Sequence, residues 1–275
     1  MKKLDTISVN LKVVSHSILF EIKLQKKKFI IFSIITLIFF FFNEVLPYVF
    51  ISPMTYLPYS QFDLYQGGIE FFMMFLFLTT GFFFSGIICT EYKKKTGLTL
   101  LPLIDKHNLI IGKYIANYIL VIGIAAIQYF LMALLNFYFY AEPIPPSLFL
   151  SFGYLALYIL ALASVTTFLS SFMPSAGSVL IIIIALILFG FSIIDLFVAP
   201  SRIEPLYSLP YLYNIISKII YPEFSTMERY FESTQNNITH RIWAFPSAEG
   251  ALIVLTLYAI IFFLLGYLVF KRRQL

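Results

Sequence analysis

The chain has 275 residues, of which 60% are hydrophobic and 12% charged, and its mean hydropathy is +0.89. This composition excludes a soluble globular domain and indicates an integral membrane protein. The formal net charge of +5 is interpreted as a topology signal rather than a nucleic-acid signal, because no basic cluster lies on a soluble module.

Six apolar runs in the chain are long enough to be membrane spans. Crossing about 30 Å of hydrocarbon as a helix takes about 20 residues. The sequence therefore predicts an all-α, polytopic membrane protein, with residues 1–275 forming a single transmembrane domain. The six predicted spans cover residues 29–50, 71–90, 114–140, 147–172, 175–194 and 251–270.

Basic residues gather on one side of the predicted spans. Fifteen of the 19 Lys and Arg residues lie before the first span, between the second and third spans, or after the sixth. By the positive-inside rule, both termini are predicted to be cytoplasmic and residues 196–247 to be extracytoplasmic. The expected location is the cell (plasma) membrane.

Residues 1–28 show apolar and polar stripes at helical spacing. The pattern predicts an amphipathic helix in the cytoplasmic interface, with its lysines toward anionic head groups of the lipid bilayer. A disordered basic tail is the alternative. The apolar stripe is Ile7, Leu11, Val14, Ile18 and Ile22, and the polar stripe is Ser8, Lys12, Ser15, Lys23 and Lys26.

Residues 91–108 join the second and third spans and are unusually rich in leucine. Aliphatic side chains are not expected in a solvated loop unless they meet the membrane surface or a partner. We interpret the segment as a docking element, and a basic loop that only fixes topology as the alternative. Glu91, at the membrane boundary, is expected to pair with a nearby lysine or with the partner, as an exposed pair that contributes about 0–1 kcal/mol.

An ordered set of motifs runs from Glu91 to the start of the third span. It comprises Glu91, Thr96-Gly97, the leucine run, Pro102, then Ile111-Gly112-Lys113 with Ala116. This order resembles the type-2 permease subunits of ATP-binding cassette (ABC) exporters. The resemblance implies that residues 91–108 form a coupling helix that docks on a cytoplasmic ABC ATPase. The residues that it assigns to coupling are Glu91, Thr96, Gly97, Leu98, Leu100, Leu101, Pro102 and Leu103.

The resemblance also implies an assembly and an architecture. An elbow helix would precede the first span, and short helices would lie between the fifth and sixth spans. Two permease copies, identical or similar, would pair through their first and fifth spans. ATP and Mg²⁺ would bind in the partner ATPase, and this chain would hold no cofactor.

Three polar side chains inside the predicted spans are candidates for a substrate path: Glu44, Asn117 and Gln128. Glu44 would be explained by an outward-facing cavity, an interhelical hydrogen bond or snorkelling to the outer surface. Asn117 and Gln128 are three helical turns apart and share a face. Hydrogen bonds between helices or contact with a substrate would explain them.

The outer segment, residues 196–247, is too apolar to be a linker. Within it Leu212, Ile215, Ile216 and Ile219 form a helical stripe. Ser225 and Glu228 have the spacing of a capping box, which predicts the start of a second short helix.

The sequence contains no recognisable catalytic or nucleotide-binding motif. Gly112-Lys113 lacks the first glycine of a phosphate-binding loop and is followed by Tyr114. The three histidines do not pair with carboxylates or cysteines at metal-ligand spacing. We therefore expect neither an enzyme nor a metal site in this chain.

The second to sixth apolar runs contain no charged residue. Ion-coupled carriers usually place charged side chains deep within their spans. If the protein transports a substrate, the energy must come from outside the chain. Together with the leucine-rich segment between the second and third spans, this points to a separate ATPase. The sequence thus favours a permease subunit of an ABC exporter, and a non-transporting membrane scaffold or assembly factor that docks a cytoplasmic partner is the alternative.

Overall fold

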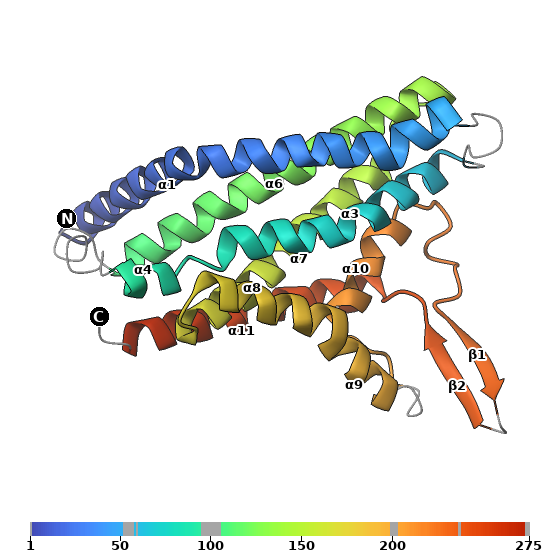
Figure 1. Ribbon diagram of the computed structural model, residues 1–275. Coiled ribbons are helices and arrows are strands. Elements are labelled where there is room, and N and C mark those ends of the chain that lie inside the picture. Colours follow the sequence, from blue (N-terminus) through green and yellow to red (C-terminus); the bar gives the residue numbers. More distant parts are fainter. Residues whose placement is uncertain are drawn as a thin grey trace.

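The computed structural model describes residues 2–51, 58, 60–94, 106–198, 203–235 and 238–272. This part of the chain is a helical bundle (Figure 1). Six of its helices are long and apolar enough to cross a membrane, and each overlaps one predicted span. They are Lys12–Tyr48, Gln61–Glu91, Asn108–Tyr140, Pro146–Phe172, Ala176–Asp195 and Ala248–Arg272. A mainly helical, multi-pass membrane protein is confirmed.

Several spans are built from more than one helical element. The first comprises α1 (Lys2–Phe40) and the π-helix η1 (Phe41–Ile51), and the second comprises α3 (Gln61–Phe84) and α4 (Cys89–Lys94). Single helices form the third, fourth and sixth, namely α6 (Lys106–Tyr140), α7 (Pro146–Phe172) and α11 (Ala248–Arg272). The fifth comprises α8 (Ala176–Ala185), η2 (Leu186–Gly190) and α9 (Phe191–Val198).

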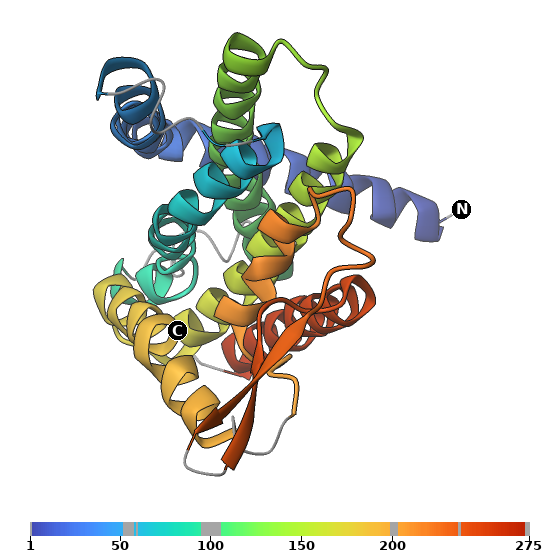
Figure 2. The same cartoon turned by 90° about the vertical axis from the view of Figure 1, so that its right-hand side faces the viewer.

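Two long helix pairs frame the bundle. Helix α1 packs along α6, and α11 packs along α7. Helix α3 lies between the pairs and contacts both α6 and α7, as Figures 1 and 2 show from two sides. The two termini and α4 lie at one end of the bundle, which we call the terminal end, and α10 and the β-strands lie at the other (Figure 1).

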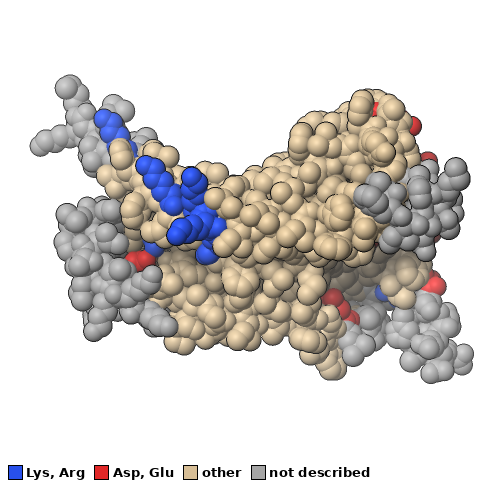
Figure 3. Space-filling view, turned by 45° about the horizontal axis from the view of Figure 1, so that its top comes forward, with Lys and Arg blue, Asp and Glu red and all other residues tan. Residues whose placement is uncertain are grey.

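The elbow helix expected before the first span is not a separate element. Helix α1 continues without interruption from Lys2 to Phe40, through the predicted amphipathic region and into the span. The physical reason is that this stretch has no glycine or proline to end a helix. Exposed lysines of this region gather along one side of α1, where Figure 3 shows them in blue: Lys12, Lys23, Lys26 and Lys27.

The first helix of the outer segment forms as predicted and packs into the bundle. Helix α10 (Leu209–Lys218) buries Leu212, Ile215 and Ile216 of the predicted stripe. The Tyr213 hydroxyl donates a hydrogen bond to the carbonyl of Ile69 in α3, at 2.8 Å. Its ring lies 5.2 Å from that of Tyr158 in α7. Helix α10 is therefore anchored to both α3 and α7.

The prediction of a second short helix in the outer segment is wrong. Ser225 lies in a turn, and the chain then forms an antiparallel hairpin of β1 (Tyr230–Gln235) and β2 (Ile238–Trp243), with Tyr230 opposite Trp243. Both strand sequences are rich in β-branched and aromatic residues, which favour strands. The capping-box spacing is not followed by an apolar run of helical period, so it has no helix to start.

Candidate functional site

The second span is interrupted at the terminal end, and a serine of α7 holds the interruption in place. Residues 85–88 form a turn between α3 and α4. The Ser170 hydroxyl donates to the Ser85 carbonyl at 2.7 Å and accepts from the backbone N–H groups of Ile88 and Cys89, at 3.2 and 3.1 Å. These are backbone groups that a helix end leaves without intrahelical partners. Ser170 therefore fixes the point where α4 begins.

We expect Ser170→Ala to lower the free energy of unfolding by about 1–3 kcal/mol, because it leaves buried backbone groups unpaired. The matched control is Thr166→Val, which also removes a buried hydroxyl from α7. Among the described residues, the Thr166 hydroxyl bonds only to the Leu162 carbonyl of its own helix, at 2.8 Å. Thermal unfolding in detergent would compare the two variants. Equal destabilisation would show that the Ser170 bonds do not hold the turn.

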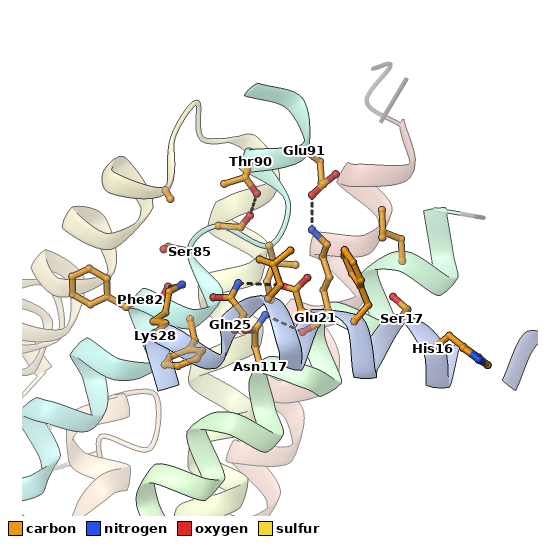
Figure 4. Close-up of a pocket in the computed structure, with 18 of the residues that line it drawn as sticks. His16, Ser17, Glu21, Gln25, Lys28, Phe82, Ser85, Thr90, Glu91 and Asn117 are labelled. Carbon is orange, nitrogen blue, oxygen red and sulfur yellow. Dashed lines mark hydrogen bonds and ion pairs between the residues drawn. The ribbon is translucent and has the colours of Figure 1, made fainter. Parts of the chain in front are cut away.

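Helix α4 carries Glu91 toward α6, where it forms an ion pair with Lys113 (Figure 4). The side chains of Glu91 and Lys113 are only 9% and 15% exposed. The expectation of an exposed pair is therefore wrong, because α4 holds Glu91 against Lys113 of α6 and both side chains are largely buried there. Breaking a buried pair costs more than breaking an exposed one, because the remaining charge is left uncompensated.

Gly112, next to Lys113, lets α1 approach α6 closely. A Cβ atom at this position would lie 2.4 Å from Oγ and 2.7 Å from Cβ of Ser17 in α1. Neither distance is compatible with ordinary packing, and Ser17 is itself buried. The Gly-Lys pair of the sequence motif thus has two structural roles, one in the contact with α1 and one in the ion pair with α4.

We expect Gly112→Ala to destabilise the protein by about 1–3 kcal/mol, the usual cost of overpacking. Gly153→Ala in α7 is the matched control, because its Cβ would meet no atom within 4 Å. There the higher helix propensity of alanine, up to about 1 kcal/mol, should leave stability unchanged or raised. Unfolding curves for the two variants test the contact, and a neutral Gly112→Ala would contradict it.

A cavity of about 920 Å³ lies beside the ion pair. Residues of α1, the α3–α4 turn, α4 and the start of α6 line it, together with Ala176 at the start of α8. Figure 4 shows polar side chains of α1 facing those of α4 and α6 across this space.

Charged side chains of α1 take part in the cavity wall. The Lys28 ammonium group donates to the Phe82 carbonyl at 3.2 Å and lies 5.2 Å from the centre of the Phe83 ring. The Glu21 carboxylate accepts from the Gln25 amide at 2.9 Å and is buried. The sequence reasoning did not single out Glu21. Glu21 is the one acidic residue between Asp5 and Glu44, in a stretch that contains several lysines. Its isolation among these lysines is the feature of the sequence that could have marked it as a candidate.

The structure separates the three candidate path residues. Asn117 lines the cavity, whereas Gln128 and Glu44 do not. Gln128 is buried deeper in α6, and its side-chain oxygen has no hydrogen-bond partner among the described residues. Glu44 is buried in η1, close to Gly68 of α3. A Cβ atom added at Gly68 would lie 3.3 Å from the Glu44 carboxylate.

The leucine-rich part of the predicted coupling helix lies outside the described residues, so its conformation stays a prediction. This applies to Thr96, Gly97, Leu98, Leu100, Leu101, Pro102 and Leu103. The described structure does place the two ends of that segment, because Glu91 and Lys113 are paired. No three His, Cys, Asp or Glu side chains in the described ranges lie close enough together to hold a metal ion.

Comparison with known proteins gives no family assignment. A scan against protein-family models finds no match, and a search of curated proteins finds no significant relative. Function is therefore inferred from the sequence pattern and the geometry.

Proposed function

We propose that this protein is the membrane-spanning permease subunit of an ABC exporter, and that a separate cytoplasmic ATPase docks on residues 91–108. The observation that supports this most is the buried Glu91–Lys113 ion pair. It joins α4 and α6 at the two ends of the leucine-rich segment. A force applied to that segment would therefore act on both helices together.

The contacts around the pair suggest how movement would spread. Helix α4 follows a turn that Ser170 holds, so α4 can tilt about a defined point. Helix α6 carries α1 with it, because the two pack along their length and meet closely at Gly112 and Ser17. Closure of two ATPase subunits on ATP would shift α4, α6 and α1 against α7 and α8. ATP and Mg²⁺ would remain in the ATPase.

A transport path between two bundles requires a second permease copy. The span Lys12–Tyr48 and the span Ala176–Asp195, the first and fifth, are less buried than the second, third and fourth, and so is the sixth, Ala248–Arg272. Large apolar side chains are exposed on both, such as Ile31 and Ile34 on α1 and Ile181 on α8. These faces are available to lipid and to the second copy that the family resemblance implies.

The proposal is tested by purifying the tagged, full-length protein from its native membranes in mild detergent. The eluate is assayed for Mg²⁺-dependent ATP hydrolysis, and the bound proteins are identified. A permease subunit should retain a stoichiometric ATPase. Retention of a stoichiometric partner without ATPase activity would instead support the scaffold alternative and contradict the proposal.

A further inference from the structure

The cavity beside the Glu91–Lys113 ion pair, which we call the terminal-end cavity, follows one face of α1. Its α1 side is a strip that runs from Lys12 to Lys28, about four helical turns. The end of α3, the turn after it and α4 form the facing wall, and the start of α6 contributes further residues. At about 920 Å³, the cavity is large enough for a small molecule or a lipid head group.

Large apolar side chains of the cavity lining are exposed at its rim. Phe20 and Leu24 on α1 are 64% and 60% exposed, and Phe82 near the end of α3 is 44% exposed. All three belong to helices that are long and apolar enough to cross a membrane. Water is a poor occupant against such a surface. Lipid chains, which surround the spans of a membrane protein, can cover it without that cost.

Lys28 places a cation without an ion-pair partner in the same cavity. One of its three N–H groups donates to the Phe82 carbonyl at 3.2 Å, as Figure 4 shows. No carboxylate of the described residues lies within ion-pair distance of its ammonium group. Glu21, two turns away on α1, is buried and accepts from Gln25. Lys28 is partly exposed and therefore has donors left for an anion that enters the cavity.

The cavity lies at the predicted membrane boundary. Lys28 immediately precedes the first predicted span, and Glu91 and Lys113 flank the second and third. The cavity is lined by three lysines and two glutamates, so it has an excess of positive charge. Basic pockets between spans on the cytoplasmic side bind anionic lipid head groups. The charge and the level of the cavity both fit such a ligand.

We propose that the terminal-end cavity binds the head group of an anionic phospholipid from the adjoining leaflet. The phosphate group accepts from Lys28, and the acyl chains leave the cavity over Phe20, Leu24 and Phe82 into the bilayer. A soluble anion would satisfy Lys28 but would leave the apolar rim against water. A zwitterionic lipid would cover the rim but would add no net negative charge to balance the lysines.

The test uses brominated lipids, which quench the fluorescence of a nearby tryptophan. Trp243→Phe removes the only native tryptophan. In that background, Leu24→Trp places a reporter at the cavity rim, and Leu268→Trp places a control reporter at an exposed position near the C-terminal end of α11. The full-length proteins are reconstituted in phosphatidylcholine nanodiscs that contain the same fraction of either brominated phosphatidylglycerol or brominated phosphatidylcholine.

The reporter at Leu24 should show a preference of about fivefold for phosphatidylglycerol, the factor expected from one lysine beside an anionic head group. The reporter at Leu268 should show none. Lys28→Gln keeps a donor for the Phe82 carbonyl but removes the charge, and it should abolish the preference. Lys27→Gln is the matched control, because Lys27 is exposed and does not line the cavity. It should retain most of the preference.

Three results would overturn the proposal. Equal quenching of the Leu24 reporter by the two brominated lipids would show ordinary lipid contact only. An equal loss of preference in Lys27→Gln and Lys28→Gln would assign the effect to the surface charge of α1. Reversal of the quenching by inorganic phosphate, but not by sodium chloride of the same ionic strength, would assign the cavity to a soluble anion. The measurement uses no ATPase, so its outcome is independent of the proposed function.

Discussion

Replacing Leu100 with aspartate is expected to leave the protein inserted in the membrane at normal abundance but to remove its ATPase. If Leu98, Leu100 and Leu101 enter an apolar groove of the partner, a charge at the centre of that contact costs several kcal/mol unless it is paired. Since 1.4 kcal/mol is a tenfold change in affinity, the loss exceeds about a hundredfold. The spans should still insert, because residues 91–108 lie outside their apolar runs.

The readouts for this variant are membrane abundance and the ATP hydrolysis that co-purifies with the tagged protein. Leu100→Met is the matched control, because a volume-conserving apolar exchange usually costs less than about 1.5 kcal/mol. It should retain the ATPase. Full retention of ATPase by Leu100→Asp would show that the segment is a topology loop, and the scaffold interpretation would gain.

Reversing the charge of Glu91 is expected to destabilise the terminal end of the bundle. Glu91→Lys would place two ammonium groups where a largely buried ion pair now lies. Removing one partner of a buried pair costs about 3–5 kcal/mol, because the other charge remains uncompensated, and repulsion adds to this. Glu91→Gln, which keeps a hydrogen-bonding group, should cost less.

The double variant Glu91→Lys with Lys113→Glu separates pairing from other roles of these positions. It exchanges the two charges across the same contact and should recover much of the stability lost in either single variant. Unfolding in detergent and co-purified ATP hydrolysis are measured for the wild type, the two single variants and the double variant. If the double variant loses as much stability as the two single variants together, the pair does not join α4 to α6.

The spans and part of the site could be predicted from the sequence because their signals are local. Twenty apolar residues in a row require a membrane, whatever surrounds them. Glu91, Gly112 and Lys113 stood out as a motif, but their contacts required the fold. Only the packing of α1 against α6 shows why position 112 is glycine, and only the approach of α4 shows that Lys113 is paired.

The remaining features depend on contacts between residues distant in the sequence. Ser170 lies more than 80 residues from the turn that it holds, and nothing in its neighbourhood distinguishes it from other serines of α7. The capping-box spacing of Ser225 and Glu228 favours a helix and does not predict the hairpin, whereas the aromatic and β-branched composition of the two strands favours it. The terminal-end cavity gathers Gln25, Phe82 and Thr90 from three separate elements.

The most direct test of the central claim is a distance measured across the terminal-end cavity during the ATPase cycle. Spin labels are placed at Lys23 on α1 and Gly177 on α8, both exposed, in a Cys89→Ala background that removes the one native cysteine. The complex with its ATPase is compared in lipid nanodiscs without nucleotide and after trapping with ATP and vanadate. A permease driven by that ATPase should show a shift of several Å in the distance distribution. Superimposable distributions, while the ATPase hydrolyses ATP normally, would contradict the account.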